Sequence, residues 1–147
     1  MFKKSIFALS LLAFAALPSA AQAEGQSQAI SKSLTECTVI FQVYGLMAKK
    51  QGKPEEMIGY FNKAAARFRD AALETAEKEG QQDPKTYVSD TYNELLPKWQ
   101  KKYAAITGED VVAMTKETKD IMDWVNYCGS LGRKINILPL PKEDTAE

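Results

Sequence analysis

The sequence predicts an all-α fold: an up-down-up-down bundle of four helices closed by one disulfide. Three observations predict it. Apolar residues recur at helical spacing in four segments, each of about twenty residues. Glycine, proline and aspartate mark short connections between these segments. The chain also contains 2 cysteines, one in the first segment and one in the last. Four helices with short connections favour an up-down bundle.

The N-terminus is typical of a secretory signal peptide. Residues 1–4 form a short cationic segment, and residues 6–17 are apolar apart from Ser10. Ala21-Gln22-Ala23 is a small-residue cleavage motif. The apolar run is shorter than the roughly 20 residues that a membrane-spanning helix needs. We therefore expect an exported protein, located in the periplasm or the extracellular space, whose mature chain begins at Glu24.

Cleavage at this motif divides the chain into three parts. Residues 1–23 are the predicted signal peptide, residues 24–135 a helical bundle domain, and residues 136–147 an extended C-terminal tail. No later segment is apolar and long enough to cross a bilayer, so no transmembrane segment is expected after signal removal. The remaining chain is long enough to bury a hydrophobic core as a single domain.

The first two predicted helices are bounded by glycine and proline. The first ends near Gly52, and the second has Pro54 in its first turn and ends near Gly80. The apolar stripe of the first is Ile30, Leu34, Cys37, Phe41, Tyr44 and Ala48. The stripe of the second is Met57, Phe61, Ala64, Phe68, Ala71 and Thr75. Small residues on the second stripe allow a neighbouring helix to approach closely.

Two further helices follow. Asp83 and Pro84 are a typical helix start, and Pro97 predicts that this third helix kinks or breaks. Residues 107–110 predict the cap of the fourth helix, which we expect to fray through Gly129 and Gly132. The third stripe is Val88, Tyr92, Leu95 and Trp99, and the fourth is Val111, Met114, Thr118, Ile121, Val125 and Cys128.

Cys37 and Cys128 are predicted to form the disulfide. Both lie on the apolar stripe of their helix, and the first and last helices of an up-down bundle are antiparallel neighbours. An exported chain also meets an oxidising environment. The alternative is a pair of buried free thiols.

In such a bundle, the positions of residues along the bundle axis predict layers of side chains. Phe68 and Val88 should lie near the disulfide. The middle layer should contain Tyr44, Phe61, Tyr92 and Ile121, and the far layer Ala48, Met57, Trp99 and Met114. Buried tyrosine hydroxyls need partners. The middle layer is therefore a candidate ligand pocket, with the residues Tyr44, Phe61, Tyr92, Thr118 and Ile121, although the tyrosines can equally bond backbone carbonyls or reach solvent.

A cluster of lysines and aromatic residues in the third helix is a candidate partner surface. Its residues are Lys98, Trp99, Lys101, Lys102 and Tyr103. This is the most concentrated positive patch of the sequence, and it would suit an acidic protein or an anionic envelope component. The alternative is an ordinary solvated surface.

Composition excludes several function classes. The chain has 19 basic and 19 acidic residues, and loss of Lys3 and Lys4 with the signal leaves a net charge of about −2. Nucleic acid is therefore not an expected partner. Histidine is absent, which removes the commonest general base and metal ligand. No phosphate-binding loop, calcium loop or C-x-x-C motif is present, so no cofactor, metal or catalytic residue is predicted.

The position of Cys128 late in the last helix resembles the cytochromes c-prime, which are exported four-helix bundles. Their haem is attached at this place through C-x-x-C-H. Residues 127–130 of this chain read Tyr-Cys-Gly-Ser, with one cysteine and no histidine. The resemblance therefore implies a bundle and no haem.

Taken together, these observations predict a small exported binding or interaction protein. Its first expected partner is another protein or an envelope component, recognised through the surface. The alternative is a small apolar or aromatic ligand held in the core. An enzyme of unknown class is the third possibility, because no constellation of residues supports one. The sequence does not predict an oligomeric state.

Overall fold

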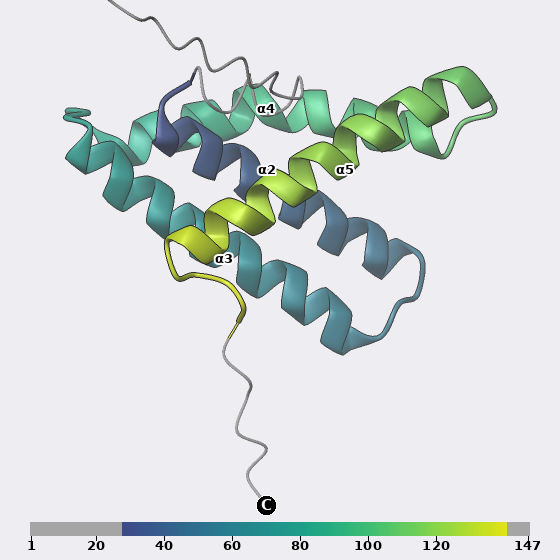
Figure 1. Cartoon of the computed structure of the whole chain (residues 1–147), viewed down its shortest axis with the longest axis horizontal. Coiled ribbons are helices and arrows are strands. Elements are labelled where there is room, and N and C mark those ends of the chain that lie inside the picture. The colour runs from purple at the N-terminus through teal and green to yellow at the C-terminus, as the bar shows by residue number, and fades with distance from the viewer. Residues whose placement is uncertain (1–27, 141–147) are drawn as a thin grey trace, which may run out of the picture.

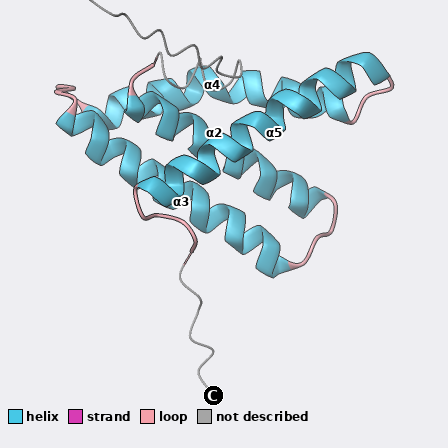
Figure 2. Cartoon of the chain, in the orientation of Figure 1, coloured by secondary structure: helices cyan, strands magenta, loops and turns pink. Residues whose placement is uncertain are grey.

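The computed structural model describes residues 28–140, and these residues form four helices joined by loops (Figures 1 and 2). The predicted signal peptide and the end of the predicted tail, residues 141–147, lie outside the described residues. The helices are α2 (Ile30–Lys50), α3 (Glu55–Lys78), α4 (Pro84–Ile106) and α5 (Val111–Lys134). No strand occurs in residues 28–140, so the all-α class is confirmed for that part.

Local capping explains where the helices begin and end. The Asp83 side chain accepts a hydrogen bond from the Thr86 N–H at 3.0 Å, and Pro84 follows as predicted. Asp110 caps α5 by accepting from the N–H groups of Val112 and Ala113. Gly52 and Gly80, after α2 and α3, have φ values of 64° and 82°, which glycine adopts without strain.

The α2 N-terminus receives its cap from another helix. No side chain of its own caps it, but the Glu79 carboxylate at the end of α3 accepts hydrogen bonds from the N–H and the hydroxyl of Ser31. A carboxylate is favoured there because the N-terminal end of a helix carries partial positive charge. This contact ties the end of α3 to the beginning of α2.

Two predictions about helix ends and interruptions need adjustment. α4 is a single helix from Pro84 to Ile106 that contains Pro97, so it is not in two pieces, and a kink at Pro97 stays a prediction. α5 does not fray at Gly129 but continues to Lys134. The reason lies at Gly132, which is buried beneath the side chain of Leu138. The residues after the helix thus fold back onto it.

The four helices do not all lie side by side. α2 contacts α3, α4 and α5, and α5 crosses over α2 and α3 at an angle in Figure 1. The loop between α4 and α5 projects away from the other two helices (Figure 1). The four-helix, all-α description is therefore confirmed, whereas the up-down-up-down order stays a prediction.

α2 is more deeply buried than a single apolar stripe implies. Every residue from 31 to 41 except Lys32 is buried, including the polar Ser33, Thr35 and Glu36. By contrast, Ile30, the first residue of the predicted stripe, is exposed. The physical reason is that α2 packs against three neighbours, so that more than one face of it is covered.

The disulfide between Cys37 and Cys128 is confirmed. The two Cα atoms are 5.6 Å apart, and both residues are fully buried. The bond joins α2 to α5 across 91 positions of sequence. It therefore links helices that are distant in the chain.

The predicted position of Trp99 along the bundle is wrong. Its ring packs against Trp124, 5.9 Å between centroids, and its indole N–H reaches Glu36, one residue before Cys37. Trp99 is therefore near the height of the disulfide and not at the far end with Met114. Lys98 and Trp99 thus meet α2 at Glu36, whereas Tyr92 meets α2 at Gln42, so no single displacement of α4 along its axis describes the difference from the prediction.

Candidate functional site

Aromatic rings fill the centre of the molecule. Tyr44 stacks on Phe61, with 5.4 Å between ring centroids, and meets Tyr103 edge to face at 5.0 Å. Tyr103 in turn packs against Trp99. Ring-to-ring packing of this kind leaves the predicted middle layer occupied by its own side chains. The hollows described below are open and lie between helices.

Glu36 is a buried carboxylate that the sequence did not reveal. It is 1% exposed, and its Oε1 accepts hydrogen bonds from Trp99 Nε1 at 2.9 Å and Lys98 Nζ at 3.0 Å. Gln28 donates to its other oxygen. Lys98 Nζ also lies 5.6 Å and 5.7 Å from the ring centroids of Trp99 and Trp124. The carboxylate is thus well satisfied, as a structural ion pair is.

The residues of the predicted ligand pocket are only partly brought together. Tyr44 and Phe61 are in contact, and Ile121 is buried. The Tyr92 hydroxyl donates to Gln42, which is two positions before Tyr44 and on another side of α2. Burial raises the pKa of Tyr92. Thr118 is exposed on α5. Tyr103 packs against the Tyr44 ring, the position predicted for Tyr92.

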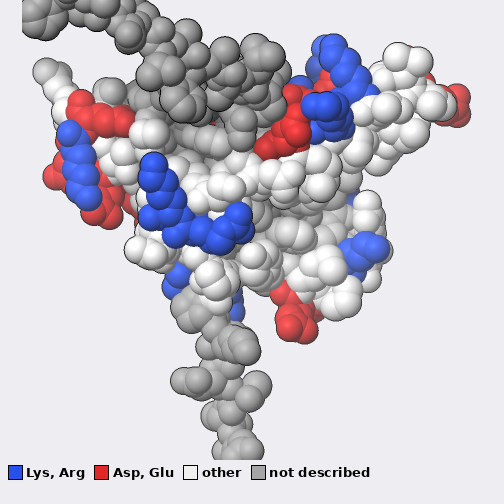
Figure 3. Space-filling view, viewed as in Figure 1, with Lys and Arg blue, Asp and Glu red and all other residues white. Residues whose placement is uncertain are grey.

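The predicted partner surface is also altered by burial. Trp99 and Tyr103 are 0% and 3% exposed, so neither ring adjoins the lysines on the outer surface. Lys98 pairs with Glu36, and Lys102 pairs with carboxylates of α5. Lys101 is exposed. Figure 3 shows basic and acidic side chains adjoining one another on the face in view.

Lys102 links α4 to α5. Its Nζ bonds Glu117, at 2.9 Å, and Asp120. Burial alone would lower the pKa of Lys102, but the two carboxylates together outweigh burial, so the pKa is raised. This lysine is therefore a structural cation and not a free binding group.

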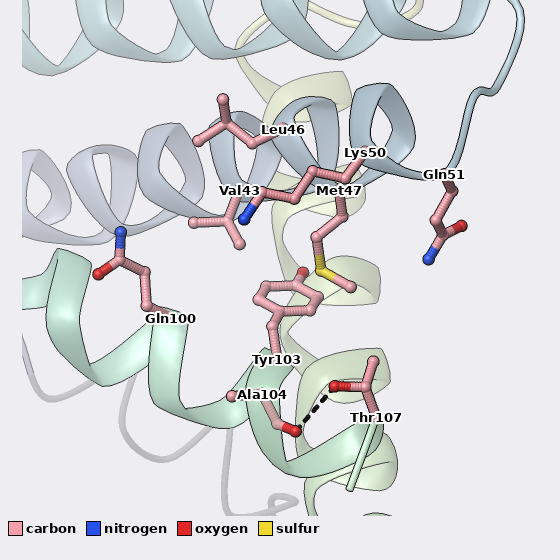
Figure 4. A pocket seen from close by; sticks show the side chains of 9 residues that line it. All are labelled: Val43, Leu46, Met47, Lys50, Gln51, Gln100, Tyr103, Ala104 and Thr107. Carbon is pink, nitrogen blue, oxygen red and sulfur yellow. Dashed lines mark hydrogen bonds between the residues drawn. The ribbon is translucent and has the colours of Figure 1, made fainter.

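A groove between the C-terminal halves of α2 and α4 is the strongest candidate site. It has a volume of about 470 Å³, within the range of small-molecule sites. Figure 4 shows the nine side chains that line it, which are Val43, Leu46, Met47, Lys50, Gln51, Gln100, Tyr103, Ala104 and Thr107. Its floor is apolar, because Val43 and Tyr103 are buried there. We call it the α2–α4 groove.

The polar groups of the α2–α4 groove are few. Lys50 is its only ionised lining residue, and no ion pair joins Lys50 to a described residue. Gln51 and Gln100 supply two amides, and no carboxylate lines the groove. In Figure 4 the Lys50 side chain extends back along α2 toward Val43. The groove thus combines an apolar floor with a sparse polar rim.

Tyr103 is the unusual residue of the α2–α4 groove. Its ring lines the groove, yet its hydroxyl is buried and has no hydrogen-bond partner in the described structure. Burial raises the pKa of Tyr103 well above the usual tyrosine range, and the nearby Tyr44 hydroxyl raises it further. Tyr103 therefore stays a neutral phenol with an unused donor.

Other hollows carry less chemistry. One of about 400 Å³ lies among α2, α3 and α4, where Thr35 and Thr38 already donate their hydroxyl protons to carbonyls of α2. Another, of about 520 Å³, is lined by Leu138 and Pro139, close to the end of the described residues. Neither has a buried, unpartnered polar atom in its lining.

The groove residues were not predicted from the sequence. Val43 and Met47 lie off the predicted stripe of the first helix, at positions i and i+4. A second apolar stripe beside the first was the available signal, because a helix with two apolar faces contacts more than one neighbour. Which neighbour it contacts depends on the axial position of α4, which the sequence pattern does not encode.

No group of three or more Cys, Asp or Glu residues could hold a metal ion within residues 28–140. In the same region, no helix is long and apolar enough to cross a membrane.

Comparisons with protein-family models, with curated proteins and with solved structures find no match to this chain. The function must therefore be argued from the chemistry of the α2–α4 groove.

Proposed function

We propose that this chain is an exported binding protein that holds a small, largely apolar molecule in the α2–α4 groove. The observation that carries the proposal is the groove itself, about 470 Å³ with buried Val43 and Tyr103 in its floor. Small-molecule sites are typically concave and mostly apolar, with a few polar groups that orient the ligand. The proposed ligand therefore lies between two helices and not in the core.

The support for this function is chemical. The groove has two amides, one cation and the hydroxyl of Thr107, which already donates to the Ala104 carbonyl. It can orient a ligand, but no base in its lining activates a nucleophile. Export belongs to the proposal as well. It rests on the N-terminal sequence, and the buried disulfide is compatible with it. An up-down-up-down order of the helices and a bend of α4 at Pro97 also belong to the proposal.

Titration with the uncharged dye N-phenylnaphthylamine tests the proposal, since its emission rises in apolar surroundings. We expect saturable binding with one site per chain. Ala104→Trp should lower the dye affinity at least about tenfold, because an indole at this lining position fills the groove.

Asn93→Trp is the matched control for that variant. Asn93 is exposed on the same helix and does not line the groove, so this change should leave dye affinity unaltered. Thermal unfolding of both variants verifies that the fold is retained. Equal dye affinity for folded Ala104→Trp and the wild type would contradict the proposal.

Interaction with another envelope protein is a second candidate. One observation favours it: Val111 and Val112, at the projecting α4–α5 end, are 65% and 80% exposed. Exposed apolar side chains that adjoin one another are typical of contact sites. Affinity capture from envelope extracts, with Val112→Glu as the comparison, tests it. A partner retained equally by both proteins would rule out this end as the contact.

A further inference from the structure

The Tyr103 hydroxyl is the feature of the α2–α4 groove that points to a ligand. A buried hydroxyl without a partner is costly, and most buried polar atoms in proteins are hydrogen-bonded. Tyr103 is 3% exposed, and its ring belongs to the groove lining. In Figure 4 the ring reaches from α4 toward α2, beside Met47. A ligand that accepts a hydrogen bond here would supply the missing partner.

Movement of the Met47 side chain would expose this hydroxyl to the groove. Its side chain lies next to the Tyr103 ring in Figure 4 and lines the groove. Methionine is unbranched and flexible, so it can change rotamer at little cost. A ligand entering the groove can therefore displace the Met47 thioether and reach the phenol beneath it.

The electrostatics of the α2–α4 groove favour an uncharged ligand. The groove lies beside the C-terminal ends of α2 and α4, which carry partial negative charge and disfavour an anion. A cation is disfavoured by Lys50, and no carboxylate in the lining would attract one. These opposing effects leave a neutral molecule as the best fit.

We propose that the α2–α4 groove selects uncharged apolar molecules that bear one carbonyl oxygen, and that the Tyr103 hydroxyl donates the hydrogen bond that selects them. The inference rests on the proposed function and adds the ligand class and the specificity-determining residue. A small aromatic or aliphatic ketone or ester has this chemistry. The raised pKa of Tyr103 agrees with this role, because the phenol stays a donor across ordinary pH.

Competition against the bound dye tests the inference with a matched pair of compounds. Acetophenone and ethylbenzene have nearly the same shape, but only acetophenone has a carbonyl oxygen. Tyr103→Phe should weaken acetophenone binding about tenfold and leave ethylbenzene binding unchanged or tighter. Benzoate, which is charged, should compete less well than acetophenone with the wild-type protein.

Tyr44→Phe is the control, because Tyr44 contacts Tyr103 but does not line the groove. It should preserve the preference for acetophenone. An equal loss in both variants, an unchanged ratio in Tyr103→Phe, or tighter binding of benzoate would each overturn the inference. If instead the dye does not bind, or folded Ala104→Trp binds it normally, the proposed function itself fails.

Discussion

Glu36 illustrates at the residue scale how a charge is kept inside this protein. Its carboxylate receives an indole N–H and a lysine ammonium, while the lysine side chain remains 40% exposed. One charge of the pair is therefore buried and the other partly hydrated. In such pairs the loss of either partner costs more than the pair contributes, because the remaining group stays buried without compensation.

Replacement of Glu36 should therefore destabilise the fold strongly. We expect Glu36→Ala to lower the free energy of unfolding by about 2–4 kcal/mol, since Trp99 Nε1 loses its acceptor and Lys98 its counter-ion. Glu36→Gln keeps an acceptor and should cost less. Urea unfolding measures both changes.

Glu77→Ala is the control for this prediction. Glu77 is exposed on α3, so its removal should change the free energy of unfolding by no more than about 0.5 kcal/mol. Similar losses in Glu36→Ala and Glu77→Ala would show that the buried pair has no special role.

The site residues were predictable only in part, because helical periodicity shows which residues share a stripe but not which polar residues become buried. Tyr44 and Phe61 were predicted to meet because they lie on the stripes of adjacent helices joined by a short loop. Glu36 lies between Leu34 and Cys37 of the first helix but off their apolar stripe. A charged residue at such a position is expected to face solvent unless another helix covers it. Its burial follows from tertiary packing and not from periodicity.

At the element scale, two glycines of α5 show that a residue's local helix preference and its packing requirement can differ. In the sequence, Gly129 and Gly132 both predict a fraying helix end, yet both lie within α5. A Cβ at Gly132 would come within 2.7 Å of Leu138 Cδ1 and 3.0 Å of Phe68 Cζ. At Gly129 the nearest atom is the flexible end of Arg133, at 3.5 Å. Only Gly132 is required by its neighbours.

The two glycines should therefore respond oppositely to alanine. Gly132→Ala should lower the free energy of unfolding by about 1–3 kcal/mol, because the core must shift to admit a methyl group. Gly129→Ala should raise it by about 0.5–1 kcal/mol, because alanine is the better helix former. Thermal and urea unfolding of both variants measure the difference, and equal effects would contradict this packing argument.

Helix boundaries were well predicted because their causes are local. Asp83 and Gly80 act within a few residues of themselves, and the structure confirms both roles. The position of α4 along its own axis was not predicted. Tyr92, Trp99 and Tyr103 all suit an inward stripe, so the pattern fits more than one axial position. The packing of Trp99 on Trp124 and Glu36 selects one of them.

At the scale of the whole molecule, the disulfide joins the first and last of the four helices. α2 and α5 make fewer direct contacts than α2 and α3 do, so the covalent bond is a main connection between them. The fold class and this bond were both predictable, because helical periodicity and a single pair of cysteines leave few choices. The crossing of α5 over α2 and α3 was not, since it depends on side-chain packing.

Removal of the disulfide should cost the molecule much of its stability. Closure of a loop across 91 positions corresponds to about 4–5 kcal/mol on the chain-entropy model, commonly less in practice. We expect Cys37→Ala combined with Cys128→Ala to lower the urea midpoint correspondingly. The wild type treated with a reductant should behave similarly, and a change below about 1 kcal/mol would contradict this structural role.

The contact between Trp99 and Trp124 makes the molecule its own optical reporter. These are the 2 tryptophans of the chain, and their rings meet edge to face at 5.9 Å. Trp124 is also one helical turn before Cys128, so a disulfide sulfur lies near enough to quench indole emission. Coupling between the two indoles would vanish when α4 and α5 separate, whereas quenching of Trp124 by the disulfide would vanish on reduction, so unfolding and reduction can each be followed without a label.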